Sequence, residues 1–148
     1  MALFTSFDTS ASGLTAQRYR MDVIAENIAN ANTTRTKDGT PYRRKVVVFE
    51  EKQAQASFDA LLKNVSNRYT GEGVKVTQVV EDQWTQMNMV YDPSHPDADE
   101  NGYVIYPNVN TVTEMTNLID ASRAYEANAT AFEASKNIAS RGLTLANS

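Results

Sequence analysis

Apolar positions recur at helical spacing near the start of the chain. Phe7, Leu14, Met21 and Ile28 follow one another every seven residues, and smaller apolar side chains flank that line at spacings of three and four. Such a stripe is typical of an amphipathic helix that buries one face. The pattern therefore predicts a long helix over residues 6–32.

A second apolar stripe occupies the end of the chain. Its positions alternate at spacings of three and four, which favours a left-handed coiled coil. The run Thr111-Val112-Thr113-Glu114 matches a capping box, so we expect the helix to begin near Thr111 and to continue to about Leu145. The stripe comprises Met115, Leu118, Ser122, Tyr125, Ala129, Phe132, Ala139 and Leu143, with one interruption at Lys136.

Between these two segments the pattern becomes that of short strands and turns. Residues 41–51 are rich in β-branched side chains, residues 71–80 alternate valines after a glycine turn, and residues 103–107 read as a last short strand. Residues 58–65 have apolar positions at helical spacing and predict a short helix. Residues 92–102 contain two prolines and four acids, which indicates a turn-rich loop.

The expected fold class is α+β, with long terminal helices packed as a coiled coil and a small β-rich domain between them. We expect an N-terminal helix in residues 1–34, a β-rich middle domain with turn-rich loops in residues 35–110, and a C-terminal helix in residues 111–148. At 148 residues the chain is long enough for one domain with a moderate core.

Composition narrows the possible functions. The net charge is −4, so basic residues do not outnumber acidic ones, and this argues against nucleic acid as a partner. The sequence contains no apolar run of membrane-spanning length, and its start lacks the basic and apolar regions of a cleaved secretory signal. Without cysteine there are no disulfides and no thiolate metal ligands.

Candidate catalytic and metal-binding residues are few. His95 is the only histidine and has no nucleophile or second ligand near it in the sequence. Residues 97–102 match the first half of an EF-hand loop, but Asn108 stands where a bidentate glutamate is needed. We therefore expect no bound calcium, no cofactor and no enzyme activity. Phosphate-binding, dinucleotide-binding and nucleophile-elbow motifs are also missing.

Basic and acidic side chains gather in different parts of the middle segment. Opposite charges on separate segments suit contacts between subunits, and a plain solvated surface is the alternative. The basic residues are Arg35, Lys37, Arg43, Arg44 and Lys45, and the acids are Glu81, Asp82, Asp92, Asp97, Asp99 and Glu100.

The chain resembles the flagellar axial proteins, the rod and hook family of bacteria. The resemblance rests on "SGLTAQRYRMDVIAENIANANTT" and "EMTNLIDASRAYEANATAFEASKNIASRGLTL" and extends over nearly the whole chain. Within that family it is similar to the C-type proteins of the proximal rod, through "DGTPYRRKVVVFEE" and "YDPSHPDADENGYVIYPNVN". Many axial proteins have a short Gly-aromatic turn after Asn32-Thr33, where this chain has "TRTKDGTPYRR".

The resemblance implies a structural subunit that polymerises into the axial drive shaft of the basal body and transmits motor torque across the periplasm. It implies export without a cleaved signal, and termini that become ordered when they pack as coiled coils inside a helical tube. The alternatives are another rod or hook subunit, or a soluble coiled-coil adaptor that forms a stable folded monomer.

The implied partners are all components of the flagellum. They are further copies of the chain, other proximal and distal rod subunits, the protein at the junction of membrane ring and rod, and the flagellar type III export apparatus. The resemblance implies no nucleic acid partner and no direct membrane span.

The end of the first helix, "AENIANANT" at residues 25–33, is rich in alanine and asparagine. Asparagine is a poor helix former because its side chain competes for backbone hydrogen bonds. A helix that simply runs into a polar loop explains Asn32, but it explains Asn27 and Asn30 poorly. In a family whose subunits stack in a tube, we expect the alanines to admit a neighbouring helix. The two amides are then expected to hydrogen-bond to the other terminal helix or to a neighbouring subunit, because buried amides fix register.

These expectations define a set of candidate residues. We predict that the N-terminal line of four apolar residues packs against three residues of the C-terminal stripe within one subunit: Phe7, Leu14, Met21 and Ile28 against Leu118, Tyr125 and Phe132. The full set of candidate packing and assembly residues is Phe7, Leu14, Met21, Ile24, Ala25, Asn27, Ile28, Asn30, Leu118, Tyr125, Asn128, Phe132 and Ile138.

Overall fold

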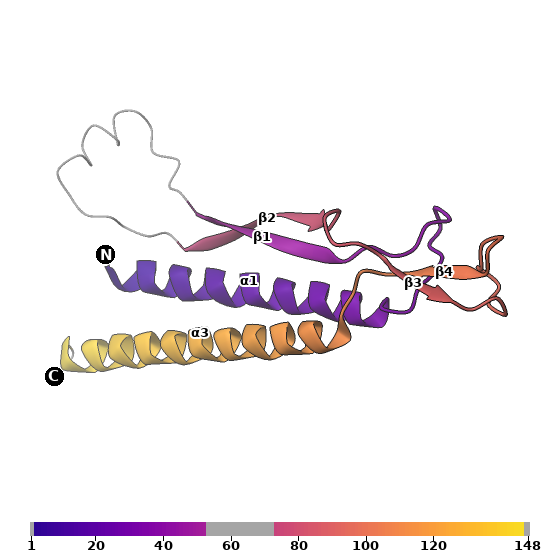
Figure 1. Ribbon diagram of the computed structural model, residues 1–148. Coiled ribbons are helices and arrows are strands. Elements are labelled where there is room, and N and C mark those ends of the chain that lie inside the picture. Colours follow the sequence, from indigo (N-terminus) through magenta and orange to yellow (C-terminus); the bar gives the residue numbers. More distant parts are fainter. Residues whose placement is uncertain (1, 53–72, 147–148) are drawn as a thin grey trace, which may run out of the picture.

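Two long helices run side by side along the molecule (Figure 1). The computed structural model describes residues 2–52 and 73–146. Helix α1 spans Ala2–Ala29 and helix α3 spans Thr111–Ala146. The N-terminal helix therefore begins and ends a few residues earlier than its apolar stripe predicts, whereas the C-terminal helix has nearly the expected bounds.

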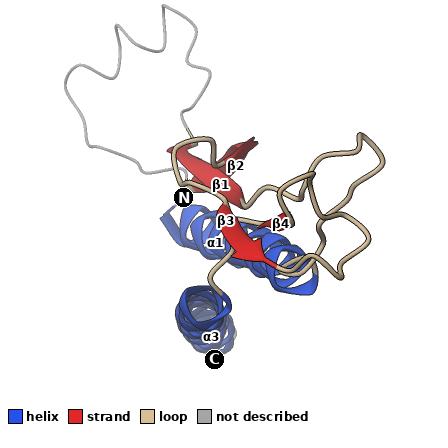
Figure 2. Cartoon of the chain, turned by 45° about the vertical axis from the view of Figure 1, so that its right-hand side comes forward, coloured by secondary structure: helices blue, strands red, loops and turns tan. Residues whose placement is uncertain are grey.

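A long antiparallel hairpin covers α1 on the side away from α3 (Figure 2). It consists of β1, Lys45–Glu51, and β2, Val74–Glu81, and its register shifts between Val48 and Phe49. Among the described elements α3 contacts only α1, so α1 is the middle layer of the molecule. Both strands were expected from their valines.

The β1–β2 hairpin is attached to α1 at a tight contact. The backbone N–H of Val74 donates a hydrogen bond of 3.0 Å to Ser12 Oγ. Gly73 precedes it with a φ of 99°, and a Cβ at that position would lie 2.1 Å from the same oxygen. Only glycine suits both the backbone conformation and the close approach.

A second, shorter hairpin lies near the end of the molecule where α3 begins (Figure 1). It pairs β3, Asn88–Tyr91, with β4, Tyr103–Tyr106. The fourth strand was predicted, but β3 was not, because all four of its residues are exposed and no burial period marks it. The short helix expected over residues 58–65 lies outside the described residues.

Small side chains set the separation of α1 and α3. Gly13 is buried, and a Cβ there would lie 2.6 Å from Oδ1 of Asn128 on α3. Ala16 on α1 and Ala121 on α3 are almost completely buried. A glycine inside a helix costs about 1 kcal/mol relative to alanine, and here close packing of the two helices offsets that cost.

The start of α3 corrects one sequence expectation. The capping-box reading makes Thr111 the cap, but the N–H groups of Val112 and Thr113 both donate to Oδ1 of Asn110, at 3.0 and 3.2 Å. Asn110 is therefore the capping residue, as asparagine commonly is. Glu114, the expected second half of the box, is buried and bonds elsewhere.

Candidate functional site: a buried polar junction and exposed apolar surfaces

Asn27 is completely buried, and its amide is fully hydrogen-bonded within the chain. Its Nδ2 donates to the carbonyl of Lys45 at 2.9 Å and to Oε2 of Glu114 at 3.0 Å. Its Oδ1 accepts the Lys45 N–H and the Tyr42 hydroxyl, both at 2.9 Å. One side chain of α1 therefore holds the start of β1 and the start of α3, and it has no donor left for a neighbouring subunit.

Glu114 is a buried carboxylate, only 1% exposed. Its Oε1 accepts from Arg44 Nε at 2.9 Å, lies 2.9 Å from a second guanidinium nitrogen of Arg44, and accepts from Asn117 Nδ2 at 3.2 Å. A buried charge is tolerated when it is paired and its remaining lone pairs are bonded. Both carboxylate oxygens meet that condition here, since Asn27 occupies the other.

Asn108 extends the same network into the loops. Its Oδ1 accepts the backbone N–H of Arg44 at 2.8 Å, and its Nδ2 donates to the carbonyls of Asp82 and Thr85 at 2.9 and 3.2 Å. The loops before β1, after β2 and before α3 are thereby joined. We call this network the polar junction; it comprises Asn27, Tyr42, Arg44, Asn108 and Glu114.

The surroundings shift the pKa values of two acidic groups in this region, the Tyr42 hydroxyl and the Asp82 carboxyl. Burial, together with the charges of Glu26, Glu81 and Glu114, raises the pKa of Tyr42 to about 12. Hydrogen bonds from Thr85 hold the pKa of Asp82 below its usual value. The Tyr42 hydroxyl therefore stays protonated, as its bond to Asn27 requires.

The basic stretch and the acidic segment meet within one chain. Arg35 forms an ion pair with Asp97 at 3.5 Å, and Arg44 lies 3.7 Å from Asp82 as well as against Glu114. The first two pairs join parts of the middle segment, and the Arg44–Glu114 pair ties that segment to α3. A role of these charges in contacts between subunits stays a prediction.

The acidic loop is built from hydrogen-bonded turns. Asp99 Oδ1 accepts the N–H groups of Asn101 and Tyr103 at 2.9 and 2.8 Å, and Asp97 Oδ2 accepts the Thr34 hydroxyl at 2.8 Å. His95 Nδ1 accepts the N–H of Asp97 at 3.1 Å. Within residues 2–52 and 73–146, no cluster of His, Asp or Glu side chains could hold a metal ion.

Several predicted packing residues come together at the α1–α3 contact. The rings of Phe7 and Phe132 meet edge to face with centroids 5.1 Å apart, and Asn128 lies against Gly13. Ile24 is buried in the core. The half-buried members of the predicted set are Leu14, Met21, Ile28, Leu118 and Tyr125.

Three other predicted residues have different surroundings. Asn30 donates to the carbonyl of Glu26 at 2.9 Å and accepts the Thr33 hydroxyl at 3.2 Å, so its amide serves the end of its own helix. Ala25 and Ile138 are exposed. The chain itself therefore leaves these last two open for contacts with neighbours.

Sequence reasoning missed most of the polar junction. One signal for Glu114 was present, because it continues the three- and four-residue spacing of Leu118 and Ala121 and so places a charge on an apolar stripe. Arg44 and Asn108 lie in segments without periodicity. Arg44 bonds Asn108 and Glu114 across more than sixty residues of sequence, and only the fold brings these groups together.

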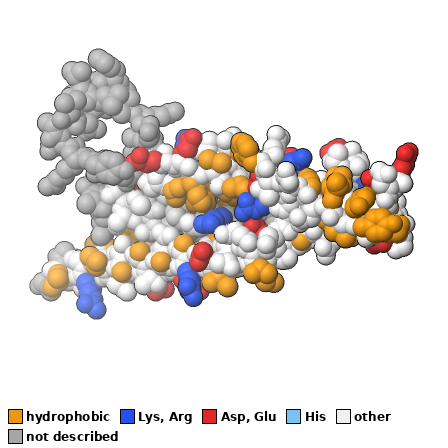
Figure 3. Space-filling model, in the orientation of Figure 1, with side chains coloured by type: hydrophobic (Ala, Val, Ile, Leu, Met, Phe, Trp, Pro, Cys, Tyr) orange, Lys and Arg blue, Asp and Glu red, His pale blue; other side chains and the backbone are white. Residues whose placement is uncertain are grey.

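Exposed apolar side chains form surfaces away from the polar junction. Val112, Met115 and Ile119 repeat at helical spacing on α3, and all three are exposed. Figure 3 shows hydrophobic side chains along α3 and at the end of the molecule that carries the β3–β4 hairpin. Patches of this kind on a protein surface mark interaction sites. In the part of the chain that the structure describes, neither helix combines the length and apolarity of a membrane span.

Two family models match the two ends of the chain. One, described as flagella basal body rod protein, matches residues 7–37 and so includes most of α1. The other, described as flagellar basal body rod FlgEFG protein C-terminal, matches residues 100–145 and includes β4 and nearly all of α3.

Similar proteins match over nearly the full length. The chain is 44% identical over 151 residues to the flagellar basal-body rod protein FlgC of Bacillus subtilis, with 98% of this chain and 99% of that protein covered. It is 43% identical over 143 residues to FlgC of Borreliella burgdorferi, with 93% of each chain covered. The FlgC of Salmonella typhimurium is 43% identical over 145 residues, with 98% of each covered.

Proposed function

Since the chain belongs to the family of the flagellar basal-body rod protein FlgC, we propose that its α1–α3 pair packs against the helices of neighbouring subunits to build the rod. The chain is a structural subunit of the proximal rod of the flagellar basal body and serves motility. It assembles with other rod and basal-body components. Our proposal concerns which surfaces make that assembly and how the subunit carries load.

The observation that carries the proposal is the one-sided burial of α3. Its inner face packs on α1, whereas Val112, Met115 and Ile119 form a ridge that is open to solvent. On an α-helix these three positions lie on the side away from Glu114 and Ala121, which are buried. A long helix with two apolar sides is typical of one that also contacts another protein. We call these three residues the outer ridge.

The polar junction suits a subunit that must transmit torque. It fixes α1, α3 and the β1–β2 hairpin through hydrogen bonds between buried groups, and each such group is costly to leave unpaired. Sliding one helix along the other would break the hydrogen bond from Asn27 to Glu114. We propose that the subunit therefore behaves as one rigid unit, with Ala25 and Ile138 among the residues that neighbouring subunits cover.

The place of the subunit follows from its family. We propose that it lies where the rod crosses the periplasm, between the membrane ring and the distal rod, and that the flagellar type III export apparatus delivers it without a cleaved signal peptide. Its proposed neighbours are copies of itself, other proximal and distal rod subunits and the protein that joins the rod to the membrane ring. A structural role without catalysis is part of the proposal.

Complementation of a flagellated strain that lacks its own FlgC tests this proposal. The tagged chain should restore swimming and co-purify with isolated basal bodies. Replacing the ridge by charge, in Met115→Glu with Ile119→Glu, should leave the subunit exported but abolish its retention in basal bodies. The matched control, Met115→Leu with Ile119→Leu, should be retained because the ridge stays apolar.

Two results would contradict the proposal. Retention of the doubly charged variant at the level of the control would show that the outer ridge makes no assembly contact. Recovery of the unaltered chain only as a monodisperse monomer outside the basal body would favour the adaptor interpretation instead.

A further inference from the structure

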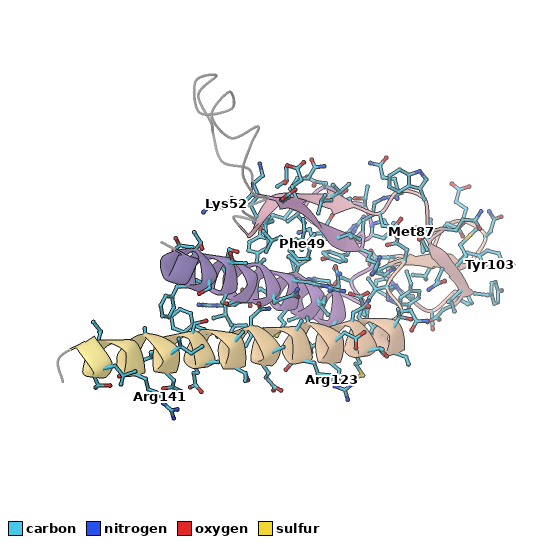
Figure 4. All side chains as sticks on the ribbon, turned by 90° about the vertical axis from the view of Figure 1, so that its left-hand side faces the viewer. Phe49, Lys52, Met87, Tyr103, Arg123 and Arg141 are labelled. Carbon is cyan, nitrogen blue, oxygen red and sulfur yellow. The ribbon has the colours of Figure 1, made fainter. Side chains whose placement is uncertain are left out.

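The outer ridge has a methionine at its centre. Met115 lies between Val112 and Ile119 on the ridge and is 55% exposed, and both of its neighbours there are exposed as well. Figure 4 shows Arg123, one turn beyond Ile119, pointing away from α1. The side chain of Met115 is therefore open to solvent in a free subunit.

Methionine supplies all the sulfur of this chain, because the sequence has five methionines and no cysteine. Hydrogen peroxide and related oxidants convert a methionine thioether into a sulfoxide. A lone pair of the sulfur attacks a peroxide oxygen, so that an S–O bond forms, the O–O bond breaks and water leaves. The methionine is oxidised and the peroxide is reduced. No exposed thiol competes for the oxidant in this chain.

The methionines differ in how far the fold covers them. Met21 and Met87 are half-buried, whereas Met89 and Met115 are exposed, and Met1 lies outside the described residues. Because oxidation follows exposure, Met89 and Met115 should react first. The half-buried pair should react mainly when the fold opens locally. Of the two exposed methionines, only Met115 belongs to the outer ridge.

Oxidation of Met115 changes the surface of α3 and leaves the polar junction untouched. The preceding residue, Glu114, is turned inward and buried, whereas Met115 is outside. The sulfoxide replaces an apolar side chain by a polar one, and in the free subunit its oxygen is hydrated. Under a neighbouring subunit the same oxygen would need a hydrogen-bond donor, since an unpaired polar group in an apolar contact is costly.

We infer that Met115 is an oxidation site through which peroxides prevent a free subunit from joining the rod. The inference rests on the proposed function, because it requires a neighbour to cover the outer ridge. Before assembly the thioether is open to oxidants, and after assembly the neighbour shields it. Subunits oxidised on the way to the rod are therefore rejected, and the finished rod resists oxidation at this position. A methionine sulfoxide reductase, with a thiol as the reductant, restores the apolar ridge.

Oxidation of the purified chain by hydrogen peroxide, followed by peptide mass spectrometry, tests the reactivity. Met115 and Met89 should form sulfoxide at least about fivefold faster than Met21 and Met87, because exposure controls the reaction. In a Met89→Leu chain, brief oxidation should then modify mainly Met115. The urea midpoint of that oxidised chain should equal the midpoint before treatment, since the sulfoxide lies on the surface.

Two substitutions separate the polarity of the sulfoxide from the loss of the methionine. Met115→Gln places a polar side chain of similar length on the ridge, and Met115→Leu keeps the ridge apolar without sulfur. Methionine, glutamine and leucine have similar helix propensities, so neither change should disturb α3. Without any oxidant, the Gln chain should be retained in basal bodies at least about tenfold less than the Leu chain, because its amide is left unpaired in the contact.

A pulse of hydrogen peroxide given to cells while they build new rods tests the inference in place. For each tagged chain, retention in basal bodies is compared with and without the pulse. The unaltered chain and Met89→Leu should lose retention, whereas Met115→Leu should give the same retention in both conditions. Sulfoxide at Met115 should be found in the unassembled chain and be at least about tenfold rarer in chain recovered from basal bodies.

Several outcomes would overturn the inference. They are oxidation of Met115 no faster than of Met21, a lowered urea midpoint after its oxidation, equal retention of the Gln and Leu chains, or an equal loss of the Met115→Leu chain under peroxide. In each case an untreated chain that still enters basal bodies would leave the proposed function intact. Failure of the untreated chain to enter them would instead overturn the proposed function, and this inference with it.

Discussion

At the scale of single residues, the side chain of Asn27 holds three segments of the fold together. Its amide forms hydrogen bonds with Tyr42, Lys45 and Glu114. Replacing Asn27 by an apolar residue would remove a partner from each of these groups at once. Each buried group left unsatisfied costs about 1–3 kcal/mol. Asn27→Leu should therefore lower the free energy of unfolding by at least about 3 kcal/mol, measured by urea denaturation.

Asn30→Leu is the matched control for that prediction. The Asn30 amide bonds only within the end of its own helix, so its replacement should cost no more than about 1.5 kcal/mol, the net contribution of a typical hydrogen bond. Equal effects of the two substitutions would show that the polar junction contributes no special stability.

Tyr42 gives the junction a testable dependence on alkaline pH. Its pKa in the folded protein is about 12, above the ordinary value of 10.0. The unfolded chain therefore loses this proton first, so the stabilisation is complete below about pH 10 and disappears as pH rises toward 12. Absorbance titration should find a tyrosine step near pH 12, and Tyr42→Phe should remove that step. The absence of a tyrosine step near pH 12 would contradict the buried hydroxyl of Tyr42.

The sequence predicts the residues of the α1–α3 contact better than the residues of the polar junction. Phe7 and Phe132 meet because each belongs to an apolar stripe with the same period. Asn27 could be singled out as an amide inside an amphipathic helix, but its partners could not. Hydrogen bonds to Tyr42, Lys45 and Glu114 depend on loop geometry, which no periodicity encodes.

At the scale of elements, the contact of α1 with α3 depends on Gly13. Alanine favours helix by about 1 kcal/mol over glycine, but its Cβ would lie 2.6 Å from Asn128 Oδ1. The Asn128 amide would have to move and give up its 2.8 Å bond to the Ala124 carbonyl. We expect Gly13→Ala to lower stability by about 1–3 kcal/mol, as overpacking does.

Two variants separate this clash from a general effect of alanine. Gly142→Ala lies on α3 with no atom near the added Cβ, and it should be neutral or stabilising by up to about 1 kcal/mol. In an Asn128→Ala background, Gly13→Ala should also cease to be harmful, because the clashing atom is gone. A destabilising Gly13→Ala in that background would mean that the backbones themselves prevent the approach.

The long elements, which repeat an apolar pattern over many residues, could be predicted from the sequence. The four-residue strand β3 could not. The apolar stripes place both helices to within a few residues, and the valines of residues 45–51 and 74–81 mark the first hairpin. Strand β3 was missed because every residue in it faces solvent. The same exposure leaves its apolar side chains, Met89, Val90 and Tyr91, open for contacts.

At the scale of the whole molecule, α3 should be protected unevenly before assembly. It packs on α1 as far as Phe132 and Ser135, whereas residues 140–145 are all exposed. A helix end without a packed face frays. Hydrogen exchange on the free subunit should therefore be slow around Ala121 and fast beyond about residue 138, and the fast region should become slow in isolated basal bodies. Unchanged fast exchange after assembly would contradict coverage of the last turns of α3 by neighbouring subunits.

The central claim is that the α1–α3 pair, fixed by the polar junction, enters the proximal rod as one unit. Cryo-electron microscopy of basal bodies from a strain that carries this chain tests it most directly. The account predicts paired helices of the lengths of α1 and α3 in the rod wall, with Asn27 within hydrogen-bonding distance of Glu114 of the same subunit and the outer ridge covered by a neighbour. Helices separated in the rod, or an outer ridge that faces solvent there, would contradict it.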